Sequence, residues 1–431
     1  MTGFYPDTAP VGLKVSLADN TQLDAFGRLR VSTPTTLFDA QQEYGLDTRS
    51  TWDVAANGVY GGYASNGSVV SGGSLVGPRN LNTRLVPITA GAVVGNSAIL
   101  QSRPYIRYIP GKSQFIAITG VYASAPGDTA SFILRSSTSG TPVEREVVQA
   151  DWSTDVFDGS GPSGLTLDFT KTQILLIDAQ WLAVGRVRLG FDIDGVFWQA
   201  HEYLNANRLA LPYTQTFNLP LRLEAVTTTE GTDLRVGYFD SANGVFLKLS
   251  SATQGAGLNF ICCTVQSEGG TEIKGLPWGI SSGENDITVS TRRPVLSIRP
   301  KATYNGITNR ARVELIDYAV LIGAQNTLVE VVVGGTLTGA SFTSVADDSV
   351  VEYDRSANAI AGGYTLRVGY GQPGTNSKGV LYQGPVDIRS PLVLSQIDAL
   401  AARQLPLTIV ATSLGGNTDT LAAINWNEET L

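Results

Sequence analysis

The feature that most constrains the fold of this chain is an alternation of apolar and polar residues that stops at short turns. Along Arg186–Ile193 every second residue is apolar: Val187, Leu189, Phe191 and Ile193. A period of two places these side chains on one face of a strand. Asp194-Gly195 follows, and the run Val196–His201 comes directly after it. Because a type I′ turn needs positive φ at both central residues, this Asp-Gly pair predicts a β-hairpin.

Strand signals of this kind recur along the chain. Further runs are Gln114–Tyr122, Ser131–Ser136, Leu219–Val226, Ile287–Ser290, Arg310–Leu315, Thr327–Val333 and Tyr364–Tyr370. Only Pro391–Arg403 has apolar residues at helical spacing, with Ser390 as a candidate N-cap. The chain has 431 residues, of which 47 are glycine, and this composition is typical of a β-rich, turn-rich protein.

These signals predict an all-β fold with three parts. Residues 1–50 are expected to form an extended N-terminal arm, and residues 51–290 a large antiparallel β-sandwich of the jelly-roll or lectin-like kind. Residues 291–431 are expected to form a smaller β-sandwich domain that contains the one short helix. The second boundary depends on the Gly- and Ser-rich stretch Gly279–Asp286 and on the restart at Arg293-Pro294.

Charge and cysteine content exclude several classes of protein. The net charge is −8, and no run of basic residues is longer than two, so we expect no nucleic-acid partner. No apolar run is long enough to span a membrane, and the first residues lack the pattern of a secretory signal. The two cysteines, Cys262 and Cys263, are adjacent and have no metal-ligand spacing around them. We therefore expect a chain made in a reducing cytoplasm, without disulfides, cofactor or membrane anchor.

Candidate catalytic and metal-binding residues each have a simpler structural interpretation. His201 is the only histidine, and it follows the hairpin strand, where a hydrogen-bonding role is more common than catalysis. Asp192 and Asp194 resemble the start of a calcium loop, but a hairpin turn accounts for both acids. Gly159–Gly164 fits GxGxxG as a string without a strand-to-helix context. We therefore predict no catalytic, metal-binding or cofactor-binding residue.

Acidic pairs and aromatic residues leave a carbohydrate function open. The acidic pairs are Glu144/Glu146, Asp155/Asp158 and Asp347/Asp348, and a pair of carboxylates across a cleft is what a glycosidase needs. Tyr60 and Tyr63, in a glycine-rich stretch, are the candidates for a glycan-binding platform. Three tryptophans lie in strand-like apolar contexts and are expected in the core: Trp152, Trp181 and Trp198.

The segment Ala25–Asp39 alternates in the same way and is expected to serve in assembly. Its candidate contact residues are Phe26, Arg28, Leu29, Arg30, Val31, Leu37 and Phe38. Such a segment suits a strand added to the sheet edge of a partner, where main-chain hydrogen bonds give affinity. The alternative is an ordinary edge strand of its own domain.

Several blocks of this sequence resemble a family of virion structural proteins found mostly in large tailed bacteriophages. The block AFGRLRVSTPTTLFDAQQEYGLDTRSTWD (Ala25–Asp53) is similar to the N-terminal segment of that family. The other blocks are Ser102–Phe115, Arg186–Tyr203, Phe217–Ala225, Arg293–Lys301 and Leu337–Phe342. The likeness is spread over most of the chain, and it is specific as a set rather than block by block.

The resemblance implies a non-enzymatic structural protein located in the virion. We expect it to be a homo-oligomer that contacts other virion proteins, as part of the tail or adsorption apparatus. One alternative within this class is a capsid decoration protein, either a cement protein or a head fibre. The alternative from another class is a receptor protein that binds or hydrolyses host surface glycans.

Overall fold

The computed structural model describes residues 35–41 and most of residues 52–429. The residues outside the description within the second range are 58, 61–68, 79, 81, 103–104, 110, 124–126, 181, 269–274, 284–286, 310, 374–378 and 384–403. The described residues are almost entirely β, all strand pairs among them are antiparallel, and a single 3-10 turn, η3 (Gln149–Asp151), interrupts them. The predicted all-β class is confirmed. No helix among them is long and apolar enough to cross a membrane.

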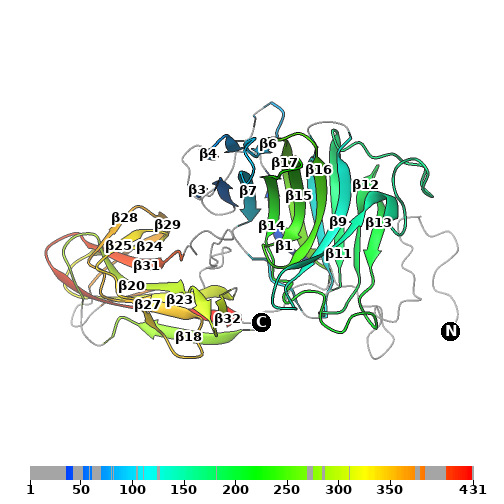
Figure 1. Cartoon of the computed structure of the whole chain (residues 1–431). Helices are drawn as coiled ribbons and strands as arrows, with labels where there is room; N and C mark the ends of the chain where they lie inside the picture. Colours follow the sequence, from blue (N-terminus) through cyan, green and yellow to red (C-terminus); the bar gives the residue numbers. More distant parts are fainter. Residues whose placement is uncertain are drawn as a thin grey trace, which may run out of the picture.

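The larger lobe, drawn from blue to green in Figure 1, contains two broad sheets. The nine-stranded sheet has the order β13 (Val196–Tyr203), β12 (Val187–Ile193), β11 (Thr172–Ala179), β8 (Gln114–Val121), β17 (Gly257–Ser267), β6 (Val86–Thr89), β5 (Ser74–Val76) and β4 (Val69–Ser71), with β1 (Thr35–Gln41) also paired to β17. The eight-stranded sheet has the order β10 (Val143–Val148), β9 (Thr129–Ser136), β16 (Gly244–Ser251), β15 (Thr232–Phe239), β14 (Leu221–Thr227), β7 (Ser97–Ser102), β2 (Trp52–Ala56) and β3 (Val59–Tyr60).

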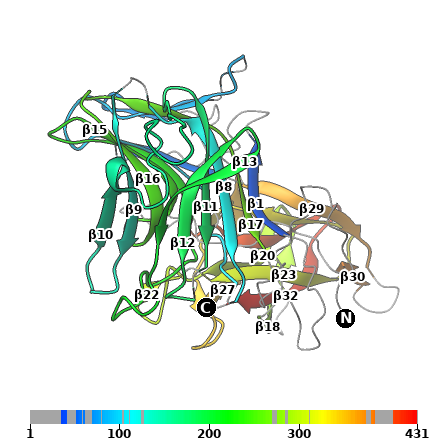
Figure 2. The same cartoon turned by 90° about the vertical axis from the view of Figure 1, so that its right-hand side faces the viewer.

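The two sheets pack face to face over one apolar core. Alternate residues of each strand enter it, such as Ile116 and Ile118 from β8 and Leu221 and Leu223 from β14. Figure 2 shows β10, β9 and β16 in one layer and β12, β11 and β8 in the other. This is the sandwich architecture that period-two alternation demands when each sheet buries one side.

The predicted hairpin forms the edge of the nine-stranded sheet. β12 and β13 pair from Val187↔Tyr203 to Ile193↔Val196. Asp194 and Gly195 have φ of 56° and 78°, as a type I′ turn requires. The amide of Gly195 donates to Oδ1 of Asp192 at 2.9 Å. The two acids that resemble a calcium loop therefore belong to this turn.

β1 pairs with β17 of its own chain, which corrects the predicted limits of the arm. Thr35 to Gln41 run antiparallel to Ser267 to Cys262, on the edge that β6 leaves open. Residues 35–41, with Leu37 and Phe38, thus form an edge strand of the larger sandwich, the alternative interpretation of this segment. The other assembly residues lie outside the described residues: Phe26, Arg28, Leu29, Arg30 and Val31.

The C-terminal lobe is a second, smaller sandwich. Its five-stranded sheet has the order β18 (Leu276–Ser281), β32 (Thr418–Glu429), β23 (Arg312–Ile322) and β30 (Gly379–Gln383), with β19 (Ile287–Val289) also on β32. Its six-stranded sheet has the order β26 (Thr343–Ser344), β27 (Val351–Asp354), β20 (Arg293–Pro300), β31 (Leu407–Ser413), β24 (Thr327–Val333) and β29 (Tyr364–Gly371). Two short ladders join β21 (Thr303–Tyr304) to β22 (Ile307–Thr308) and β25 (Thr336–Thr338) to β28 (Ala359–Ala361).

The pairing of β18 moves the predicted domain boundary. β18 and β19 both pair with β32, the last of the described strands, so residues 276–281 and 287–289 belong to the C-terminal sandwich. The sequence placed the start of this domain at residue 291, because its Gly- and Ser-rich stretch resembles a linker. Gly279 to Ser281 of that stretch lie within β18 itself. The predicted helix at Pro391–Arg403 lies outside the described residues.

A buried ion pair connects the two lobes. Nη1 of Arg107, in the connection between β7 and β8, lies 2.7 Å from Oε1 of Glu429 at the end of β32. The two side chains are 9% and 1% exposed, so both charges are largely removed from water. A charge buried in this way is costly unless its partner stays in place.

We expect Arg107→Ala to destabilise the chain by about 3 kcal/mol, because it removes an arginine that is ion-paired with a buried carboxylate. Calorimetry should show the two lobes unfolding at temperatures that lie further apart than in the wild type. The control is Arg186→Ala, since Arg186 and Glu202 form a partly exposed pair at 4.0 Å, where we expect less than about 1 kcal/mol. Equal losses in the two variants would contradict a coupling role for Arg107.

Candidate functional site

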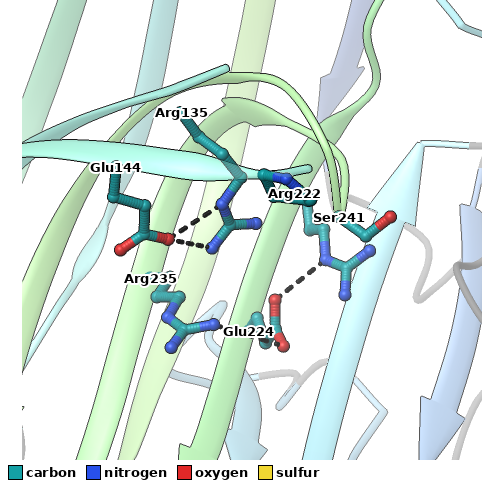
Figure 3. A pocket seen from close by; sticks show the side chains of 7 residues that line it. Arg135, Glu144, Arg222, Glu224, Arg235 and Ser241 are labelled. Carbon is teal, nitrogen blue, oxygen red and sulfur yellow. Dashed lines mark hydrogen bonds and ion pairs between the residues drawn. The ribbon is translucent and has the colours of Figure 1, made fainter. Parts of the chain in front are cut away.

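The most distinctive polar feature of the larger sandwich is a hollow of about 340 Å³ on the outer face of its eight-stranded sheet. Its described lining residues are Arg135, Pro142, Glu144, Arg222, Glu224, Arg235 and Ser241. Strand geometry explains the arrangement: Leu221 and Leu223 of β14 enter the core, so Arg222 and Glu224 face outward. Figure 3 shows the charged side chains converging from neighbouring strands.

Ion pairs connect the charged residues across the strands. Nε and Nη2 of Arg135 donate to Oε1 of Glu144, at 2.9 and 2.6 Å, and Nη1 donates to the carbonyl of Asp240 at 2.8 Å. Nε of Arg222 donates to Oε2 of Glu224 at 3.0 Å. Arg235 stands directly opposite Glu224 in the β14–β15 ladder, and Nη1 of Arg235 lies 3.9 Å from Oε1 of Glu224. These ion pairs hold five neighbouring side chains in fixed positions.

The hollow has a small apolar base of its own. Ile133, Phe239 and Phe246 form a buried cluster that is separate from the main core. The guanidinium carbon of Arg135 lies 4.8 Å from the ring centroid of Phe246, and that of Arg222 lies 5.6 Å from the ring centroid of Phe239. Cation–π contacts of this kind position the two arginines from below.

The electrostatics of Glu224 favour the ionised form. Burial alone would raise the pKa of this carboxyl, but Arg222 and Arg235 outweigh it and hold the pKa below its usual range. A general acid needs a raised pKa to carry a proton near neutral pH. Glu144 forms an ion pair with Arg135, and its predicted partner Glu146 contacts Nζ of Lys248 at 2.6 Å. The arrangement therefore suits hydrogen bonding rather than proton transfer.

His201 serves as a buried hydrogen-bond acceptor. Its Nδ1 accepts from the amide of Ser153 at 3.1 Å, and its ring stands edge-on to Tyr203 with centroids 4.7 Å apart. Burial, together with the nearby charge of Arg145, lowers the pKa of His201 to about 4. The side chain is therefore neutral at pH 7 and fixes the loop that precedes β11.

The remaining candidate residues do not converge on this hollow. The amides of Ser163 and Ser160, within the Gly159–Gly164 stretch, donate to the carboxylates that precede it. The amide of Ser163 donates to Asp155 at 2.7 Å, and that of Ser160 donates to Asp158 at 2.8 Å. These bonds identify a turn rather than a phosphate-binding loop. The backbone of Tyr60 is in β3, and Tyr63 lies outside the described residues. Within the described ranges, no three His, Cys, Asp or Glu side chains gather as a metal site would require.

The described tryptophans differ in how deeply they are buried, and so do the two cysteines. Trp152 is buried and stacks on Phe132 with centroids 4.4 Å apart. Trp198 was expected in the core but is 37% exposed, because β13 is the edge strand of its sheet. Trp181 lies outside the described residues. Cys263 enters the core, while Cys262 is half-buried.

Comparisons with known proteins give little beyond the fold. No family model and no curated protein matches this chain. Among solved structures, a lectin from Bauhinia forficata in complex with GalNAc is similar to it at 9% sequence identity, covering 55% of this chain and 98% of that one, with a TM-score of 0.17. A likeness this weak carries no argument about function.

Acidification should weaken the fold through His201. The folded pKa is about 4 against an ordinary value of 6.5, so the unfolded state binds more protons between these values. Stability is therefore complete above about pH 6.5 and falls as the pH decreases towards 4, by about 1–2 kcal/mol at pH 5. We expect His201→Asn, whose amide oxygen can accept from Ser153, to remove this part of the pH dependence. Urea unfolding of both proteins at pH 8 and pH 5 provides the measurement, and identical pH slopes would contradict the assignment.

Proposed function

We propose that this chain is a non-enzymatic structural protein of a tailed-phage virion, which works as a homo-oligomer on the tail or adsorption apparatus. The observation that carries the proposal is where the family-like blocks fall in the fold. Arg186–Tyr203 spans the β12–β13 hairpin, Phe217–Ala225 leads into β14, and Arg293–Lys301 contains β20. These are framework strands of both sandwiches, so the likeness concerns the scaffold as a whole.

Exposed apolar residues on edge strands support assembly. β29 ends the six-stranded sheet and pairs only with β24 among the described strands. Val368 and Tyr370 on β29 are 64% and 71% exposed, and both lie on the face of the sheet that points away from the core. An exposed apolar edge beside unpaired backbone groups is a ready site for pairing with another chain.

A second copy of this chain is the partner that suits β29. Two identical edge strands can pair antiparallel about a two-fold axis, which brings Val368 and Tyr370 of one copy onto the same residues of the other. The same reasoning applies to β13, where Val196 is 50% exposed next to Trp198. Pairing of the two copies would bury these apolar side chains away from water and would satisfy the backbone groups of both edge strands.

The state of the carboxylates supports a non-enzymatic role. Glu144 and Glu224 are the two carboxylates that line the hollow, and both are ion-paired with arginines. No Tyr or Trp is among the described residues that line their hollow. Glycan hydrolysis would instead require one carboxyl with a raised pKa.

Replacing both apolar residues of the edge, as Val368→Lys with Tyr370→Lys, should convert the oligomer to a smaller species. The lysines of one copy would face the same lysines of the other copy across the two-fold axis, and this repulsion is unfavourable for pairing. Light scattering after size-exclusion chromatography gives the mass. Leu414→Lys is the control, because Leu414 is also exposed but lies in the turn between β31 and β32. An unchanged mass in the double variant would rule out this edge as the junction.

Immunogold labelling of intact particles from the phage that encodes this chain tests its place directly. We expect label on the tail or its tip. Label over the head would replace the tail assignment with capsid decoration. Particles without label, when the antiserum recognises the purified chain, would overturn the virion proposal.

A further inference from the structure

The hollow on the eight-stranded sheet combines rigid walls with polar groups that have spare hydrogen-bonding capacity. Arg135 is held by three hydrogen bonds and by the ring of Phe246, and Arg222 is held by Glu224 and by Oε1 of Gln101 at 3.2 Å. Groups fixed before a ligand arrives do not have to be ordered on binding. The walls are therefore preorganised.

Spare donors come from Arg235 and Ser241. On Arg235, Nη2 donates to Oδ2 of Asp233 at 3.0 Å, and Nε is buried out of reach of a ligand. Its Nη1 is 3.9 Å from Glu224, which is too far for a hydrogen bond. Ser241 stands exposed at the rim of the hollow. Figure 3 shows Arg235 between the two glutamates.

Spare acceptors lie beside these donors. Oε1 of Glu144 takes both hydrogen bonds from Arg135, so its Oε2 stays open, and the Glu144 side chain is 38% exposed. Oε1 of Glu224 faces Arg235 at the same 3.9 Å. A carboxylate can accept at about four lone-pair sites, so neither glutamate is saturated.

The charges around the hollow cancel. Arg135, Arg222, Arg235 and Lys248 supply four positive charges, and the neighbouring Glu144, Glu146, Glu224 and Asp233 supply four negative ones. A ligand carboxylate would meet two glutamates that have open oxygens, which opposes its binding. A hydroxyl both donates and accepts, so a neutral ligand with several hydroxyls matches mixed donors and acceptors.

We propose that this hollow binds a neutral sugar residue of a surface glycan. Arg235 and Ser241 would donate to ring hydroxyls while Glu144 and Glu224 accept from them. A volume of about 340 Å³ lies at the lower end of ligand sites, which suits one or two sugar residues. The assignment rests on the proposed function only in that host contact is where an adsorption protein would use such a site.

Titration of the full chain with methyl glycosides of glucose, galactose, mannose and N-acetylgalactosamine, followed by ligand-observed NMR, tests the proposal. We expect at least one of them to bind, and glucuronate to bind more weakly than methyl glucoside. Arg235→Ala should weaken binding by roughly tenfold, as loss of hydrogen bonds from a charged donor does. Ser241→Trp should abolish binding, because it fills the hollow without removing a charge.

Arg186→Ala is the matched control, since Arg186 lies beside the other sheet and is not among the residues that line the hollow. It should leave the affinity unchanged. Ser241 is exposed, so its variant keeps the test valid if Arg235→Ala fails to fold. Binding of glucuronate alone, no binding of any glycoside, or binding that survives both variants would overturn the site. None of these results depends on where gold label falls on the particle.

Discussion

The packing of the nine-stranded sheet against the eight-stranded sheet is the constraint on which the rest of this structure depends. One continuous core joins them, and it includes Trp52, Phe191 and Tyr238, all fully buried. Because every strand must turn alternate residues into this core, the inward positions accept only apolar side chains of suitable size. The outward positions remain free to vary, and the chain concentrates its unusual chemistry there.

The outer face of the eight-stranded sheet shows what that freedom permits. Arg222 and Glu224 are almost completely buried although they point away from the core. Removing such charges from water is costly, and their mutual attraction only partly offsets the cost, so a charged layer of this kind adds little to stability. With apolar residues of similar size at these positions, the fold would be at least as stable. The presence of paired charges is understandable when the layer has a binding role. The Nη1 donors of Arg235, which are too far from Glu224 for a hydrogen bond, support this interpretation.

Local patterns predicted the strands well and the long-range arrangement poorly. The hairpin at Asp194-Gly195 and strands such as Thr327–Val333 depend on residues that are neighbours in sequence, and both form as expected. The pairing of β1 with β17, the return of β32 beside β18, and the meeting of Arg135 with Arg222 depend on contacts between distant segments. Alternation marks an arginine as outward but does not show which strand lies beside it. For the same reason the hollow could not be predicted from the sequence, since an outward charge on a strand is ordinary.

The edges of the sheets differ in a way that bears on assembly. β10, at one edge of the eight-stranded sheet, turns Glu144 and Glu146 outward, and charges on an edge discourage pairing with another chain. The edge strands β13 and β29 instead expose Trp198 and Tyr370. β10 also exposes Val143 and Val148, but its outward glutamates set it apart from the other two edges. Because Glu144 of β10 lines the hollow, the ligand and the neighbouring subunit that we propose would approach the molecule at separate places.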